Sequence, residues 1–168
     1  MRRTPDTGRS DDATLAIRPP AGADAPRLDA LVVQLGYPSR AGEIRARIER
    51  LVTLPDHLLL VAEENGTVIA WVHAAEQELF ESGRRCEILG LVVDTARRRG
   101  GVGRTLVAAV EHWARARGLT EVSVRSNVVR AESHPFYERL GYARAKTQHV
   151  YRKSLLRDSS RAGAEGQA

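Results

Sequence analysis

The stretch Leu91–Leu106, LVVDTARRRGGVGRTL, passes through three kinds of pattern within a short span. An apolar run ends at Asp94, a cluster of arginines and glycines follows, and a helical period begins at Val102. The apolar run predicts a central strand, because a strand buried on both faces lacks polar alternation. A helix that begins after a glycine turn points unpaired backbone N–H groups at any anion placed there. The stretch therefore predicts a strand–loop–helix unit that is able to bind phosphate.

Two common nucleotide motifs do not fit the glycine cluster. A P-loop requires glycine where Arg98 stands and lysine where Arg104 stands. The dinucleotide fingerprint G-x-G-x-x-G ends on Leu106 instead of glycine. A purely structural alternative stays open on this stretch alone, in which the glycines make a tight turn and the arginines are solvated.

The patterns on either side of this stretch predict a mixed α/β domain. Apolar spacing near 3.6 indicates helices, and alternation or short apolar runs bounded by turn residues indicate strands. Helices are expected over residues 24–35, 39–51, 102–117 and 134–140. Strands are expected over residues 14–18, over 57–79 on both sides of a turn at 64–66, and over 86–94, 120–126 and 142–155, the last with a turn. A polar loop is expected over residues 81–85. The resulting order is βααββ followed by β-loop-αβαβ.

Composition and charge narrow the classes of protein. One domain is expected over residues 14–156, between polar tails at 1–13 and 157–168 that we expect to be disordered. The single cysteine, Cys86, excludes an internal disulfide framework and offers no metal-ligand spacing. No apolar run is long enough to span a membrane and the first residues lack a signal-peptide core, so a cytoplasmic protein is expected. The net charge of +5 raises the possibility of nucleic-acid binding. Arginines interleaved with acids, and only 5% aromatic residues, make nucleic acid an unlikely partner.

Two motifs resemble signatures of one family, the GCN5-related N-acetyltransferase (GNAT) family. The arginine–glycine loop resembles the family's R/Q-x-x-G-x-G/A phosphate loop, with Arg98, Gly101 and Gly103 at the marked positions. The stretch HPFYERLGY, residues 134–142, is similar to the second signature, F-Y-x-x-x-G-[FY]. The element order agrees with that of the family over nearly the whole body of the chain. The resemblance implies a GNAT-type α/β fold, with a central, mostly antiparallel sheet, two splayed parallel strands and about four flanking helices.

The resemblance also implies a site for acetyl-CoA, without any metal. The cofactor is expected in the gap between the strands 87–94 and 121–126, with its pyrophosphate on the N–H groups of residues 99–104. Its pantetheine is expected to pair like a strand with the backbone near Leu91 and Val93. A backbone distortion that serves the thioester is expected near Gly90. The residues expected to bind the cofactor are Leu91, Val93, Arg98, Arg99, Gly101, Val102, Gly103, Arg104, Thr105, Asn127 and Phe136.

Two side chains are candidates for proton transfer. Tyr137 matches the family tyrosine that protonates the leaving CoA thiolate, and its structural alternative is a packed aromatic residue on a short helix. Glu87 opens an otherwise apolar strand at the offset of the family's glutamate base. Its structural alternative is a strand-end charge paired with Arg84 or Arg85. Both alternatives stay open for Glu87.

The acceptor is the least determined part of the prediction. The family implies direct attack on acetyl-CoA, in a ternary complex, by a primary amine of a small molecule or a peptide, and a homodimer on family precedent. The resemblance implies that the helix pair over residues 24–54 lines the acceptor site. Its net-basic composition argues mildly against a polycationic aminoglycoside. Trp71 and His73 share one face of a strand that lines either the core or the acceptor cleft. The alternative function is a non-catalytic basic module that binds nucleic acid or senses acyl-CoA.

Overall fold

The computed structural model describes residues 15–37, 42–127 and 133–155. The tails that we expect to be disordered lie outside the described residues. The chain divides into two compact units, Met1–Arg130 and Ala131–Ala168, and each is described separately.

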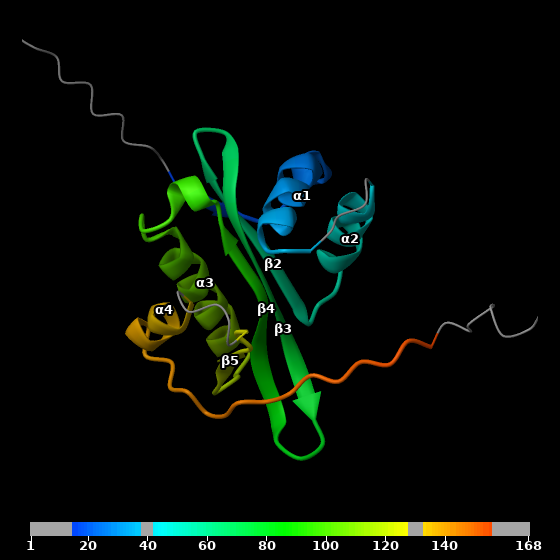
Figure 1. The fold of residues 1–168 in the computed structure, drawn as a ribbon, viewed down its shortest axis with the longest axis vertical. Coiled ribbons are helices and arrows are strands. Elements are labelled where there is room, and N and C mark those ends of the chain that lie inside the picture. Colours follow the sequence, from blue (N-terminus) through cyan, green and yellow to red (C-terminus); the bar gives the residue numbers. More distant parts are fainter. Residues whose placement is uncertain (1–14, 38–41, 128–132, 156–168) are drawn as a thin grey trace, which may run out of the picture. The chain divides into compact units, whose positions relative to one another are not determined.

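The first unit is built on a sheet in which the strands follow one another in chain order. The first four strands pair antiparallel, and the last pair is parallel (Figure 1). This mostly antiparallel sheet with one parallel pair confirms the predicted fold class. The strands are β1 (Leu15–Arg18), β2 (His57–Glu64), β3 (Thr67–Leu79), β4 (Gly83–Val93) and β5 (Val122–Val124).

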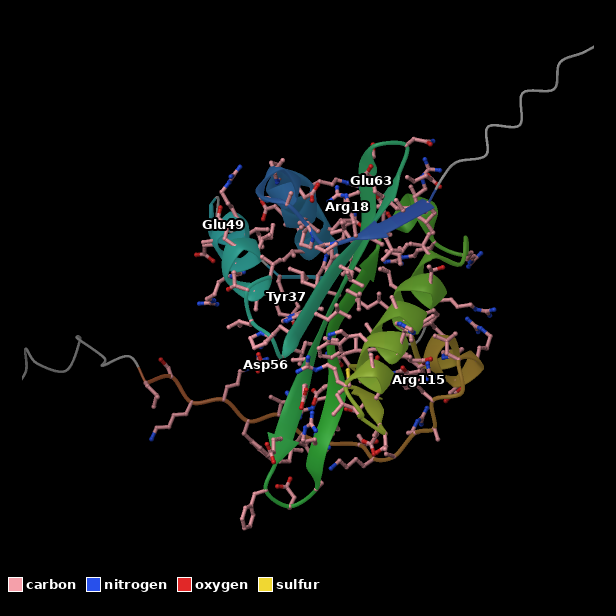
Figure 2. All side chains as sticks on the ribbon, turned by 180° about the vertical axis from the view of Figure 1, so that it is seen from behind. Arg18, Tyr37, Glu49, Asp56, Glu63 and Arg115 are labelled. Atoms are coloured by element: carbon pink, nitrogen blue, oxygen red, sulfur yellow. The ribbon has the colours of Figure 1, made fainter. Side chains whose placement is uncertain are left out.

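Helices cover both faces of this sheet. The helices α1 (Ala25–Gln34) and α2 (Glu43–Leu51) lie on one side, and α3 (Val102–Ala116) lies on the other (Figure 1). Short 3-10 turns precede α1 at Gly22–Asp24 and follow β4 at Thr95–Arg97. The side under α1 and α2 has a core of apolar residues that includes Leu28, Leu31, Ile44, Ile48, Val61, Val68 and Val92. Figure 2 shows Arg18 beside Glu63, where β1 is joined to β2 by an ion pair of 2.5 Å.

The predicted hairpin between β2 and β3 is confirmed by its turn. Asn65 and Gly66 both have positive φ, 50° and 77°. Two consecutive left-handed residues make the tight turn whose twist suits a two-residue hairpin, and asparagine followed by glycine is the pair that tolerates it best.

Two strand boundaries differ from those predicted. The polar residues Arg84 and Arg85 were expected in a loop, but β4 already includes them, opposite Glu78 and Gln77. Their polarity comes from a hairpin end that reaches solvent, where Arg84 pairs with Glu76 at 2.5 Å. The strand expected over 120–126 is shorter, because only Val122–Val124 pairs with β4.

The second unit contains the short helix α4 (Ser133–Arg139), as predicted. Gly141 follows it with a φ of 88°, the left-handed conformation typical of a residue after a helix C-terminus. The strand expected over 142–155 is wrong as far as the structure describes the chain, because residues 143–155 are exposed and adopt no regular structure. An alternating pattern indicates the two faces of a strand but does not show that a neighbouring strand exists. The described part of this unit contains no other strand with which the segment could pair.

Candidate active site

A β-bulge interrupts β4 opposite the middle of β3. His73 pairs with Gly90 and Ala74 pairs with Ile88, so Leu89 is an extra residue without a partner on β3. Only glycine fits beside the bulge, since a Cβ at Gly90 would lie 2.7 Å and 2.8 Å from two atoms of the Trp71 ring. The distortion expected at Gly90 is therefore confirmed as a feature of the backbone.

Beyond the bulge, β4 runs on without β5. The parallel pairing joins Cys86–Ile88 to Val122–Val124, whereas β4 continues to Val93. The Asp94 N–H donates to the carbonyl of Ile69 on the β3 side at 2.8 Å. Because successive residues of a strand turn their N–H and C=O groups to opposite edges, Leu91 and Val93 turn theirs to the edge that β5 has left. These are the two residues expected to pair with the pantetheine.

The arginine–glycine loop ends in a helix N-terminus with unused donors. Arg99 and Gly101 are both left-handed, with φ of 71° and 81°, and Gly101 is the residue before α3. The Thr105 N–H donates to the Gly101 carbonyl at 3.1 Å, so the N–H groups of residues 102–104 have no partner in the helix. The first turn contains no acidic residue and no side chain caps it. Its partial positive charge is thus left for an anion.

The junction between β4 and this loop is fixed by Asp94. Its carboxylate accepts from the Ala96 N–H at 3.0 Å and from the Arg27 guanidinium of α1. These bonds, the backbone one foremost, lower the pKa of Asp94. Arg27 also donates through Nε to the Val68 carbonyl at 2.8 Å. The loop is therefore tied to a helix and to β3 at its first residue.

The side chains of the loop are partly engaged within the loop. The Thr105 hydroxyl donates to the Gly101 carbonyl at 3.4 Å, and Arg98 Nε lies 3.5 Å from the Val93 carbonyl. Arg97 forms an ion pair with Glu64 at 3.1 Å. The backbone of the loop thus offers more donors to a ligand than the Thr105 hydroxyl does.

Glu87 is buried between two arginines. It is 3% exposed, and Arg125 reaches it from beyond β5, with 3.0 Å between Nε and Oε1. Arg85 lies 3.7 Å from its other oxygen. The Arg85 contact agrees with the structural alternative, while the Arg125 contact was missed, since the sequence does not give the register of β4 against β5. The carboxylate of Glu87 is thus paired with guanidinium groups on both sides.

Sequence reasoning also missed a pair of histidines on adjacent strands. His57 Nδ1 of β2 lies 2.8 Å from His73 Nε2 of β3, and the rings stack at 5.1 Å. Burial, and then the nearby His57, lower the pKa of His73 to about 4. The register places His73 directly opposite Gly90, at the bulge. The only sequence signal was the position of His73 on a strand face that lines core or cleft.

In the second unit, Tyr137 is held among aromatic rings. Its ring centroid lies 5.0 Å from that of Phe136 and 5.6 Å from that of Tyr142, both edge to face. The Tyr142 N–H also donates to the Tyr137 carbonyl at 3.0 Å. These contacts fix the helix end that carries the second motif. Asn127 belongs to the first unit, where it follows β5 and is exposed.

The described residues contain neither a cluster of metal ligands nor a membrane-spanning helix. Among them, no three histidine, cysteine, aspartate or glutamate side chains gather as metal ligands would. No described helix has the length and apolar character needed to cross a bilayer.

The sequence profile that matches this chain is that of the acetyltransferase (GNAT) family, over residues 29–142. The matched span contains the bulged strand, the arginine–glycine loop and the helix with the second motif. The chain belongs to the GNAT acetyltransferase family. The predicted family and the predicted class of enzyme, an acyltransferase, are thereby confirmed.

Individual GNAT relatives act on different amines, as their names state. The chain is 28% identical over 116 residues to aminoglycoside N(6')-acetyltransferase type 1 of Klebsiella aerogenes, a match covering 67% of this chain and 76% of that protein. It is 36% identical over 111 residues to glucosamine 6-phosphate N-acetyltransferase 1 of Oryza sativa subsp. japonica, covering 62% and 64%. The structure of aminoglycoside N-acetyltransferase AAC(6')-Iy in complex with CoA superposes with a TM-score of 0.77 at 20% identity, over 86% of this chain and 97% of that one. That likeness shows the GNAT fold.

Proposed function

We propose that this GNAT protein transfers the acetyl group of acetyl-CoA to a primary amine of a small molecule, within a ternary complex. The observation that carries the proposal is the open edge of β4 beside its bulge, followed directly by the uncapped N-terminus of α3. In the reaction the amine nitrogen attacks the thioester carbonyl, the C–N bond forms and the C–S bond breaks. The products are the acetylated amine and CoA.

The cofactor is proposed to lie along the open edge of β4. Its pantetheine pairs with the backbone of Leu91 and Val93, and its pyrophosphate accepts from the N–H groups of residues 102–104. Arg98, Arg99 and Arg104 supply positive charge, and Asn127 and Phe136 complete the predicted contacts. The existence of a CoA complex for a protein of the same fold supports this assignment.

Proton transfer is assigned to Tyr137 and Glu87. We assign to the Tyr137 hydroxyl the proton that the leaving thiolate takes up, and to Glu87 the first proton lost by the acceptor ammonium, directly or through water. Backbone N–H groups at the bulge are proposed to stabilise the oxyanion. A bridging water is the favoured route, because the Glu87 carboxylate is buried between Arg85 and Arg125.

The acceptor is proposed to be a small amine, with a peptide amine as the second choice. The charges of the helix pair are largely matched within the protein, which removes the argument against a cationic acceptor. Asp24 pairs with Arg18, Arg27 with Asp94, Glu43 with Arg47, and Arg45 with Glu49. The names of the relatives favour an amino sugar.

The test has a binding arm and a transfer arm. Calorimetric titration with acetyl-CoA and with CoA should give saturable binding of both. The purified protein is then incubated with acetyl-CoA and neamine, sisomicin, glucosamine 6-phosphate or a peptide with a free N-terminus, while thiol release and product mass are followed. Thiol release that depends on one of these amines supports the proposal. Saturable binding without transfer to any amine would indicate an acyl-CoA sensor, and no binding at millimolar acetyl-CoA would contradict the cofactor site.

Two further features belong to the same proposal. They are a cytoplasmic location, as expected from the sequence, and assembly as a homodimer, on family precedent. Sedimentation equilibrium of the full chain measures the second directly, and a monomer at every concentration would contradict it.

A further inference from the structure

The position of the stacked pair His57–His73 in the fold is not explained by packing alone. Its two rings come from neighbouring strands, and His73 is the β3 residue directly opposite Gly90 at the bulge. Period-two alternation puts His73 on the same face of the sheet as Trp71, the ring that covers Gly90. The pair therefore lies beside the bulge, where the proposed function places the thioester carbonyl and its oxyanion.

The hydrogen bond between the two rings determines which ring nitrogens are not used in the contact between them. A neutral imidazole has one N–H and one lone pair, and the contact uses Nε2 of His73 and Nδ1 of His57. If His73 donates, its Nδ1 retains a lone pair and His57 has its proton on Nε2. Across the described part of the chain, neither of these two outer nitrogens has a hydrogen-bond partner.

Acetyl transfer to an ammonium has a proton balance that one base does not complete. The nitrogen loses one proton before it attacks and a second as the tetrahedral adduct becomes an amide. The CoA thiolate takes up one proton, so one proton per turnover goes to solvent. Glu87 has been assigned the first proton that the nitrogen loses, and Tyr137 the proton that the thiolate takes up. No group has yet been assigned the second proton that the nitrogen loses.

We propose that His73 takes this second proton at Nδ1 and passes its own Nε2 proton to His57, which releases one from Nε2 to solvent. This inference rests on the proposed function. Both rings begin and end neutral, and the tautomers reset by exchange with water. The adduct nitrogen is far more acidic than a free ammonium, so a weakly basic imidazole suits this step better than the first.

The charged groups around the pair are compatible with neutral rings. On the same face, β4 contributes Glu87 with Arg85, and Arg125 follows β5, so these three groups leave one net positive charge, which disfavours protonated rings. The helices above this face present apolar residues such as Leu31 and Ile48 to it. Burial first, and then the nearby His57, account for the low pKa of His73 and keep it neutral at physiological pH.

Three variants separate a proton acceptor from a packing residue. His73→Gln retains a donor for His57 and removes the lone pair at Nδ1, so kcat should fall by about 100-fold with little change in KM for the amine. His73→Ala should be partly rescued by added imidazole, in proportion to its concentration. The His57→Asn side chain still accepts the His73 bond through its amide oxygen but cannot take up one proton and release another, so its kcat should lie between wild type and His73→Gln. The matched control is His112→Gln, on an exposed position of α3, which should leave kcat unchanged.

The measurement uses acetyl-CoA with the best amine of the panel above, and calorimetric CoA affinity verifies that each variant is folded. A kcat for His73→Gln equal to wild type would overturn the inference and leave the proposed function intact. Absence of transfer by the wild-type protein would instead overturn the proposed function, and this step with it. Nitrogen-15 NMR of the resting protein is an independent arm. The expected state has the proton of His73 on Nε2, and a proton found on Nδ1 would also overturn the inference.

Discussion

Gly90 is required by a neighbour's ring and not by a turn. A Cβ there would lie 2.7 Å from the far edge of Trp71, so Gly90→Ala should destabilise the fold by about 1–3 kcal/mol in urea unfolding. Trp71→Phe removes the contacting atoms, and the double variant should lose less than the sum of the two single changes. Gly100→Ala is the control, because its Cβ would meet only the Arg97 carbonyl at 3.7 Å. Strict additivity of Gly90→Ala and Trp71→Phe would contradict this account.

His73 should make stability depend on pH in a window of its own. Burial lowers its pKa from 6.5 to about 4, so the unfolded chain binds a proton that the folded chain resists. The stability that it contributes is present in full above pH 6.5 and is lost as the pH falls from 6.5 toward 4. The urea midpoint of the wild type should therefore drop between pH 7 and pH 5, and that of His73→Gln should drop less. Three carboxylates, Asp24, Glu76 and Asp94, have a pKa lowered from ordinary values between 3.8 and 4.5, so the stability that they contribute is lost mainly below this pH range. Equal drops in the two proteins would show that His73 keeps an ordinary pKa.

Tyr137 should affect turnover and not cofactor binding. Its ring is held between Phe136 and Tyr142, and phenylalanine keeps those contacts while removing the hydroxyl. If the hydroxyl protonates the thiolate, Tyr137→Phe should lower kcat by about 100-fold and leave the CoA affinity within about 2-fold. Steady-state kinetics and calorimetry on the same preparation measure both quantities. An unchanged kcat would assign Tyr137 to packing alone.

At the scale of elements, the same substitution can be compared at the two ends of α3. Gly101 and Gly118 flank the helix with similar left-handed φ, 81° and 73°, and neither has an atom within 4 Å of an added Cβ. Valine at either position strains the backbone, so both variants should lose stability. Only Gly101→Val displaces the proposed phosphate donors, and it should weaken CoA binding at least about 10-fold, or about 1.4 kcal/mol. Equal CoA affinities for the two variants, measured by calorimetry, would place the phosphates elsewhere.

The elements that sequence predicts well are those whose signal is local. The period from Val102 and the flanking glycines indicate α3, and the pair Asn65-Gly66 indicates the hairpin, because each pattern depends on adjacent residues. The contact between Glu87 and Arg125 depends on how a strand registers against one far away in the chain, which no local pattern encodes. His57 and His73 lie on the two strands of that hairpin, but a register shift at Ala62 and Glu63 lies between the turn and the histidines, and no local pattern encodes it.

The segment 142–155 shows the limit from the other direction. Its alternation is typical of a strand, but a strand forms only where a partner edge exists, and partners are a property of the whole chain. The two catalytic candidates, Tyr137 and Glu87, belong to different units of the chain, and no local pattern relates residues so far apart in the sequence.

For the whole molecule, the net charge of +5 could attract either CoA or a nucleic acid. The salt dependence of binding distinguishes a CoA enzyme from a nucleic-acid-binding module. Many arginines of the described residues pair with carboxylates, as Arg18 does with Asp24 and Arg27 with Asp94, so fewer of them are left for phosphate contacts. A nucleic acid would then be held by few phosphate contacts, and its affinity should become negligible at about 150 mM salt. CoA should lose less than about 10-fold in affinity between about 50 and 200 mM salt, because backbone donors and strand pairing contribute beside charge. Calorimetry with CoA and fluorescence anisotropy with a labelled oligonucleotide, in the same buffers, make the comparison. Oligonucleotide binding that is tighter than CoA binding at the higher salt would favour the nucleic-acid module over the enzyme.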